Sequence, residues 1–223
     1  MLYLPGGAFI HPITRSHWRL IHQLVRRTGA PVVVAAYGLA PDHTPDAAWK
    51  LATTLYRTLS ETGTPVVVMG DSAGGNLALS LTQQWADSGL IPPARVVVIS
   101  PWLDLTLSNP DIPSVAPSDP MLDAGGLRVA ARWWTGESDP TEPEYSPVHL
   151  DYTDSPPVEI IIGTRDLFHP DARLLAARAR ERAWPLSVAC YPGGFHVFPA
   201  LVWLPESRRA LTRMAALING ARS

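Results

Sequence analysis

The chain has 223 residues, of which 46% are hydrophobic and 17% are charged, and this length fits one packed domain over residues 1–223. Its formal net charge is −2 and no basic block stands out, so the composition argues against nucleic-acid binding. No apolar run approaches the ~20 residues of a membrane span, which argues against an integral membrane segment.

Short β-branched runs alternate with longer amphipathic stretches along the chain. Strands are predicted at residues 2–4, 31–36, 65–69, 95–100, 158–162 and 186–191. Helices are predicted at residues 17–27, 45–59, 74–88, 171–182 and 205–217. Valine-rich runs such as 66–68 and 96–99 are apolar on both faces, so both faces of these strands must be covered. The alternation predicts an α/β fold with a mostly parallel, doubly wound sheet and helices on both faces.

The first and last predicted strands bear on the cellular setting of the protein. The first follows Met1 directly, and no signal-peptide pattern is present, which predicts a cytoplasmic location. The last contains Cys190, the only cysteine, which excludes an internal disulfide and a cysteine metal cluster. Because its neighbours have the composition of a strand, Cys190 is predicted to be a buried structural thiol.

The stretch at about residues 103–150 interrupts the strand–helix rhythm. It is rich in Pro, Asp and Ser, with one helical segment at 127–134. A structureless loop of this length is uncommon in a compact domain unless it has a function. We interpret it as a partial lid beside a site; a plain surface insertion is the alternative.

Residues 70–74 read Gly-Asp-Ser-Ala-Gly and fit the G-x-S-x-G pattern. By composition alone such a match arises in on the order of one chain in ten, so the motif is weak by itself. Its context is stronger, because a valine-rich strand precedes it and a helical stretch follows, as in a nucleophile elbow. The start of that helix adds a partial positive field where an oxyanion would form. Ser72 is therefore the predicted nucleophile.

A serine nucleophile needs a general base, which in this fold is a histidine late in the chain. Only His149, His169 and His196 follow the elbow. His196 ends a Gly-rich loop just after the last predicted strand, at the sheet edge where α/β proteins place their sites. His149 belongs to the insertion, and His169 lies among the acid candidates and is expected to bond locally. His196 is the predicted base.

The base needs an acid to orient it. Asp166 follows the predicted strand 158–162 directly, at another carboxyl strand end. The competitor Asp171 follows Pro170 at a helix start, where a carboxylate is typically an N-cap or first-turn residue. Asp166 is the predicted acid.

Residues 5–9 read Pro-Gly-Gly-Ala-Phe and follow the first strand. Glycines allow backbone N–H groups to turn towards a ligand. The N–H groups of Gly6 or Gly7, with that of Ala73 after the nucleophile, would supply an oxyanion hole. An ordinary Gly-Gly turn is an equally supported alternative.

Taken together, these motifs resemble the hormone-sensitive-lipase-like (family IV) esterases of the α/β-hydrolase fold. The resemblance rests on residues 3–9, 37–43, 70–76, 100–104, 163–166 and 194–198, in the expected order and spacing. It implies hydrolysis of carboxylic esters by a triad and an oxyanion hole. The implied triad is Ser72, Asp166 and His196, and the implied oxyanion donors are Gly6, Gly7 and Ala73.

The sequence departs from the family pattern in the loop after the first strand, at Gly38, where many members carry an arginine that pairs with an acid at the position of Asp42, and at its N-terminus. Pro5 stands where the family motif begins with histidine, and Ala8 replaces a glycine and is expected to be tolerated if its φ is negative. The family also has two earlier strands and an N-terminal cap, so the fold is expected to be N-terminally short unless the true start lies upstream. Strand 32–36 then becomes a sheet edge, an association hazard that makes a homodimer an expected partner.

The predicted reaction is hydrolysis of a small-molecule ester with a short acyl chain through an acyl-enzyme. The alternatives are a lactone or amide hydrolase with the same triad, or a non-catalytic small-molecule-binding protein on the same fold. No metal or cofactor is expected, because neither a H-E-x-x-H motif nor a phosphate loop is present. The candidate pocket residues, each of which could instead be core, are Trp102, Trp133, Phe195 and Val197.

Overall fold

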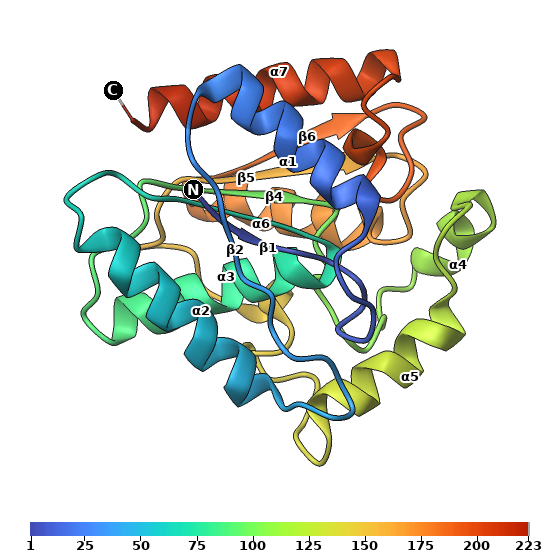
Figure 1. The fold of residues 1–223 in the computed structure, drawn as a ribbon. Helices are drawn as coiled ribbons and strands as arrows, with labels where there is room; N and C mark the ends of the chain where they lie inside the picture. Colours follow the sequence, from blue (N-terminus) through green and yellow to red (C-terminus); the bar gives the residue numbers. More distant parts are fainter. Residues whose placement is uncertain (223) are drawn as a thin grey trace.

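The computed structural model describes residues 1–222, which form a single sheet with helices on both faces (Figure 1). The strands are β1 (Leu2–Leu4), β2 (Val33–Val34), β3 (Val67–Asp71), β4 (Arg95–Ile99), β5 (Val158–Gly163) and β6 (Leu186–Tyr191). The strand order is β2-β1-β3-β4-β5-β6, and every neighbouring pair is parallel. The predicted parallel α/β sheet is confirmed.

Two layers of helices cover the sheet. The helices are α1 (Arg15–Thr28), α2 (Pro45–Ser60), α3 (Ser72–Asp87), α4 (Ile112–Val115), α5 (Ala124–Thr135), α6 (His169–Arg182) and α7 (Pro205–Gly220). Short 3₁₀ turns are η1 (Ala116–Ser118), η2 (Pro147–His149) and η3 (Phe198–Ala200). Helices α1 and α7 pack together on one face of the sheet, whereas α2 and α3 lie on the other (Figure 1).

The central strands are buried on both sides, as their valine runs require. In β4, Val96 and Val98 belong to the core beneath α2 and α3, whereas Val97 and Ile99 belong to the core beneath α1 and α7. This alternation follows from the two-residue period of a strand. The hydrophobic effect on both faces therefore fixes β4 at the centre of the molecule, next to β3, whose end carries the candidate nucleophile.

The predicted element boundaries differ from the structure at two instructive places. The strand predicted at 31–36 shrinks to Val33–Val34, because β2 lies at the sheet edge and pairs only with the three-residue β1. The helix predicted from residue 74 begins at Ser72, so the elbow serine is itself the first helical residue.

Residues 103–150 contain α4, η1, α5 and η2 and pack against the main domain. The ring of Trp134 in α5 stacks on that of Phe9, with ring centroids 4.2 Å apart. In Figure 1, α4 and α5 lie beyond the ends of the strands, on the side where the β1 loop turns. The insertion therefore packs against the core of the domain through Trp134, next to the loop after β1.

Cys190 is exposed, which corrects the prediction of a buried thiol. Cys190 lies on the edge strand β6, and its side chain lines the open groove between this strand and α6. Its Sγ atom lies 3.3 Å from Nε2 of His169 at the start of α6.

Within residues 1–222, none of the helices combines the length and the apolar character that crossing a membrane requires.

Candidate active site

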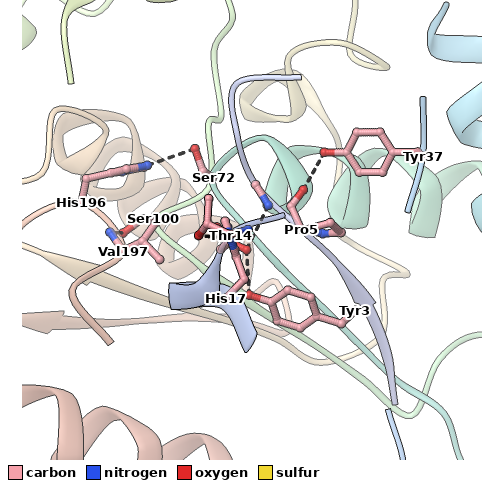
Figure 2. A network of polar contacts seen from close by, with 11 residues as sticks. Tyr3, Pro5, Thr14, His17, Tyr37, Ser72, Ser100, His196 and Val197 are labelled. Atoms are coloured by element: carbon pink, nitrogen blue, oxygen red, sulfur yellow. Dashed lines mark hydrogen bonds and ion pairs between the residues drawn. The ribbon is translucent and has the colours of Figure 1, made fainter. Parts of the chain in front are cut away.

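Ser72, His196 and Asp166 come from three different strand ends and meet in one buried chain of contacts. Oγ of Ser72 lies 3.0 Å from Nε2 of His196, as Figure 2 shows. Nδ1 of His196 lies 3.2 Å from each carboxylate oxygen of Asp166. All three side chains are buried. This is the geometry of a nucleophile, a base and an orienting acid.

The elbow geometry depends on glycine at two positions around the serine. Ser72 has a φ of 51°, in the left-handed region that is strained for a residue with a side chain. A Cβ atom at Gly70 would meet the carbonyl oxygen of Gly74 at 2.3 Å, and one at Gly74 would meet the carbonyl oxygen of Leu4 at 2.0 Å. Close backbone packing around β3 and α3 therefore holds the serine in its strained conformation and presents its hydroxyl to the cavity.

The loop that carries His196 is held by contacts with neighbouring strand ends. The N–H of Val197 donates to Oγ of Ser100, 3.0 Å away at the end of β4 (Figure 2). A Cβ atom at Gly163 would meet the carbonyl oxygen of Gly194 at 2.1 Å, so the β5 end and the histidine loop touch through backbone. These contacts fix the imidazole between the serine and the acid.

The environment of His196 favours its protonated form. Burial opposes protonation, but the charge and hydrogen bond of Asp166, with smaller contributions from Asp119 and Asp71, outweigh it. The pKa of His196 is therefore raised above the ordinary value of histidine. A raised pKa makes the imidazole a stronger acceptor for the serine proton.

The loop after β1 offers two free backbone donors, of which Gly7 was predicted and Ala8 was not. The N–H of Gly6 donates to Oδ1 of Asp71 at 3.0 Å, so Gly6 does not supply a free donor. The N–H groups of Gly7 and Ala8 have no acceptor within residues 1–222, and both residues line the same cavity as Ser72. The available pair is thus displaced by one residue from the predicted Gly6 and Gly7.

Backbone conformation explains the displacement. Gly7 has a φ of 130° and Ala8 a φ of 52°, so the loop turns sharply after Gly6. The positive φ at Ala8 differs from the negative value under which an alanine was expected to be tolerated, and it carries a cost of about 1–2 kcal/mol. Ala73 follows the nucleophile in the first turn of α3, where a helix has N–H groups without intrahelical partners.

A cavity of about 380 Å³ opens beside Ser72 and His196. Phe195 and Val197, two of the candidate pocket residues, line it. Trp102 does not: it is fully buried, and its ring stacks on that of Phe168, with centroids 5.8 Å apart. Trp133 lies on the surface, 51% exposed. Apolar wall residues that sequence reasoning missed are Met121, Leu122, Leu127, Ala200 and Leu201.

The alternative base and acid candidates lie elsewhere. His149, His169 and Asp171 line a separate groove of about 740 Å³ beside α6, whose lining does not include Ser72. Oδ1 of Asp171 accepts a hydrogen bond from Asn109 at 2.8 Å, and Asp171 belongs to the first turn of α6, as predicted.

Two carboxylates that sequence reasoning missed support the site. Asp119 accepts the N–H of Leu167 at 2.8 Å with one oxygen and the N–H of Met121 at 2.8 Å with the other, which ties the insertion to the acid loop. Asp71 lies inside the elbow motif and contacts the loop after β1. The residues around Asp119 in the sequence give no indication of its role. Asp71 is part of the recognised elbow motif, but its hydrogen-bond partners could not be predicted.

Comparison with known proteins places the chain among hydrolases. Residues 1–200 match the family profile described as alpha/beta hydrolase fold. An acetyl-hydrolase of Streptomyces hygroscopicus is 35% identical over 99% of this chain and 75% of its own length. A solved esterase of the bacterial hormone-sensitive lipase family superposes with a TM-score of 0.94 at 26% identity, over 100% of this chain and 76% of its own. An esterase/lipase from an uncultured bacterium superposes with a TM-score of 0.91 at 29% identity, over 99% of this chain and 75% of its own.

Proposed function

This chain belongs to the alpha/beta hydrolase fold family as an esterase- or lipase-type enzyme, and from that premise we propose that it hydrolyses carboxylic esters through an acyl-enzyme on Ser72. The resemblance to hormone-sensitive-lipase-like esterases is confirmed. The observation that carries the proposal is the contact chain from Oγ of Ser72 through His196 to Asp166.

In the proposed reaction, Oγ of Ser72 attacks the ester carbonyl carbon while Nε2 of His196 takes the hydroxyl proton. Asp166 accepts the hydrogen bond of Nδ1–H and stabilises the imidazolium that forms. The tetrahedral intermediate collapses when His196 gives the proton to the leaving alcohol. Water then attacks the acyl-enzyme, with His196 again as base, and releases the carboxylic acid and free Ser72.

The carbonyl oxygen becomes an oxyanion in both tetrahedral intermediates. We assign its stabilisation to the N–H groups of Gly7, Ala8 and Ala73. Gly7 and Ala8 have no other acceptor within residues 1–222, and Ala73 lies at the start of α3, where the helix field favours negative charge. Gly6 is left out because its N–H already binds Asp71.

The cavity supports a small ester with a short acyl chain. Its volume of about 380 Å³ is at the small end of ligand pockets, and its apolar wall includes Leu122, Leu127 and Val197. Leu122 and Leu127 come from residues 103–150, which supports the proposal that this segment is a partial lid. The S. hygroscopicus relative is named for the shortest common acyl group, which agrees with this choice.

A substrate panel and a label test the function directly. A fluorophosphonate probe is expected to label the wild-type chain at Ser72, and p-nitrophenyl esters from acetate to laurate are expected to give their highest kcat/KM at acetate to butyrate. A lactone or an anilide turned over faster than any ester would replace the ester proposal. Absence of both labelling and turnover would favour the non-catalytic alternative. The cytoplasmic location and the homodimer stay predictions.

We expect kcat/KM to rise with pH through one ionisation, that of His196. The base must be neutral to take the serine proton, so activity is lost as the pH falls below the pKa of His196. Because that pKa is raised, the midpoint is expected above the ordinary ~6.5 of histidine. Initial rates on p-nitrophenyl acetate, corrected for p-nitrophenolate ionisation, measure the profile. A flat profile from about pH 5 to 8 contradicts a histidine base.

Replacing Gly7 with alanine is expected to lower kcat by roughly 10²–10³, the scale of losing one oxyanion donor. A Cβ atom there would meet the carbonyl oxygen of His11 at 2.3 Å, and a φ of 130° is open only to glycine. The loop must therefore change conformation and turn its N–H groups away.

The matched control is Gly63→Ala, at another glycine with positive φ, where a Cβ atom meets nothing within 4 Å. It also places an alanine at a positive φ, but in the loop after α2, away from the cavity. Its kcat is expected to stay at the wild-type value. Equal activities in the two variants would remove Gly7 from the oxyanion hole.

A further inference from the structure

The carboxylate of Asp71 lies next to the nucleophile and receives three hydrogen bonds. Oδ1 accepts from the hydroxyl of Tyr3 at 2.7 Å and from the N–H of Gly6 at 3.0 Å, and Oδ2 lies 3.2 Å from Nε2 of His17. The carboxylate is buried, so these donors replace its lost water. Figure 2 shows the side chains of Tyr3 and His17 converging near the loop that begins at Pro5.

The start of α1 fixes the orientation of the His17 ring. The backbone N–H of Thr14 donates to Nδ1 of His17 at 2.9 Å, in a capping arrangement at the helix N-terminus. Nδ1 is therefore an acceptor, so the ring proton is on Nε2, which donates it to Asp71. His17 is mostly buried, with 12% of its side chain exposed, and it lines the cavity beside Ser72.

The partners of Asp71 hold the loop after β1 on one side. The N–H of Gly6 binds the carboxylate directly, and a Cβ atom at Gly6 would meet Oδ2 of Asp71 at 2.3 Å, so the approach is as close as glycine permits. On the other side, the hydroxyl of Tyr37 donates to the carbonyl oxygen of Pro5 at 2.5 Å. The peptide between Pro5 and Gly6 is thus clamped immediately before the free N–H groups of Gly7 and Ala8.

The clamp opposes strain in the loop. Ala8 and Phe9 both have positive φ, a conformation that residues with side chains keep only when the surroundings over-determine it. Pro5 has no N–H of its own with which to anchor the loop. The carbonyl oxygen of Gly7 accepts from the N–H groups of Ile10 and His11, which holds the peptide that carries the Ala8 N–H. The Asp71 carboxylate holds the loop just before it, at Gly6, and so helps to set the direction of the Gly7 N–H.

We propose that His17 is a positioning residue of this enzyme, which acts through Asp71 to hold the Gly7 and Ala8 N–H groups towards the developing oxyanion. The proposal rests on the proposed ester hydrolysis. By donating to Oδ2, His17 keeps the carboxylate rotated so that Oδ1 faces Gly6. Without that donor, Oδ2 is buried and unpaired, and the carboxylate turns or recruits water, which releases the loop.

The test compares His17→Gln with His17→Asn. The Gln amide nitrogen reaches about as far as Nε2 of histidine and can still donate to Asp71, whereas the shorter Asn amide stops near the position of Nδ1. We expect kcat on p-nitrophenyl acetate to fall about 10- to 100-fold in His17→Asn, with KM within about threefold of wild type, and to be largely retained in His17→Gln. A purely structural role would lower the thermal unfolding midpoint of a variant without lowering kcat at temperatures where the variant is folded.

A transition-state analogue supplies the second measurement. A trifluoromethyl ketone adds to the serine and leaves a hemiketal oxyanion in the same hole, so its Ki is expected to rise in step with the fall in kcat/KM. In the double variant with Asp71→Asn, the loss is expected to be less than the product of the single losses, because both residues act through one contact. His22→Asn is the matched control, since His22 is exposed on the same helix α1.

The outcomes separate the two proposals. If the wild-type chain neither hydrolyses the ester nor takes the fluorophosphonate label, the proposed function fails. If wild type is active and His17→Asn matches His17→Gln and His22→Asn in kcat and Ki, the positioning role of His17 is overturned. Thermal unfolding midpoints check that all variants are folded. Because Asn is shorter than Gln and packs less well, kcat and Ki are compared at a temperature where both variants are fully folded, and the two ratios together decide.

Discussion

Replacing Ser72 with alanine is expected to lower kcat for ester hydrolysis by about 10⁶, the scale on which triad serines act. The reason is that the hydroxyl oxygen bonds to the acyl group, and Nε2 of His196 has no other hydrogen-bond partner within residues 1–222. Only the binding cavity and the oxyanion donors remain in the variant. The fold is expected to survive, because alanine fits wherever serine does and Oγ is bonded only to His196 within residues 1–222.

Ser80→Ala is the matched control for this prediction. Ser80 lies two turns further along α3, and its buried hydroxyl has no hydrogen-bond partner within residues 1–222. Removing it deletes the same atom from the same helix without touching the site, so wild-type kcat is expected. Single-turnover rates and fluorophosphonate labelling of both variants provide the measurement. More than a few per cent of wild-type activity in contaminant-free Ser72→Ala would exclude Ser72 as the nucleophile.

The features that the sequence predicted well are those encoded by neighbouring residues. The valine runs at 66–68 and 96–99 predict strands that are buried on both faces. Successive side chains of a strand point to opposite faces of the sheet, so an uninterrupted apolar run is stable only where both faces are covered. The elbow around Ser72 is likewise local, since a strand, a glycine-flanked serine and a helix follow one another. Chain order then placed His196 and Asp166 at strand ends, where a parallel sheet brings them to one edge.

The oxyanion loop could not be predicted at the same level, because its conformation depends on contacts distant in sequence. The sequence gives no reason to distinguish Gly6 from Gly7. The difference comes from the carboxylate of Asp71, some sixty-five positions away, which accepts a hydrogen bond from the N–H of Gly6. The same long-range contact hides His17, which in the sequence is one polar residue of an amphipathic helix. The positive φ of Ala8 has no local signal either, because alanine ordinarily avoids it.

The pocket shows a further limit of pattern reasoning. Trp133 and Trp134 are adjacent in α5, about 100° apart around the helix, so one faces solvent and the other the core. The composition of the sequence does not tell which of the two tryptophans is buried. The cavity wall is formed instead by aliphatic residues such as Leu122 and Leu127. Trp102 lies in the core, in a stack with Phe9 and Phe168.

Replacing Asp166 with asparagine is expected to lower kcat by about 10⁴ while the geometry is retained. Oδ1 of Asp166 also accepts the N–H of Phe168 at 3.0 Å, and an asparagine carbonyl oxygen can keep that bond. The asparagine amide group then faces Nδ1 of His196 and donates to it. The imidazole consequently places its proton on Nε2, the atom that must accept the proton of Ser72. The variant has its catalytic histidine in the wrong tautomer, and raising the pH cannot restore it.

Asp171→Asn distinguishes this effect from the loss of any carboxylate near the start of α6. Burial raises the pKa of Asp171 to about 6, and Oδ1 is bonded to Asn109, so the neutral amide replaces a group that is already easily protonated. Its groove does not include Ser72, and kcat is expected to stay within about twofold of wild type, as for substitutions away from a site. Steady-state kcat on p-nitrophenyl acetate, measured for both variants at pH values above the His196 transition, decides the assignment. A large loss in Asp171→Asn with a small loss in Asp166→Asn would exchange the two acids, and equal losses would mean that the charge of this region, rather than the hydrogen bond to Nδ1, sustains catalysis.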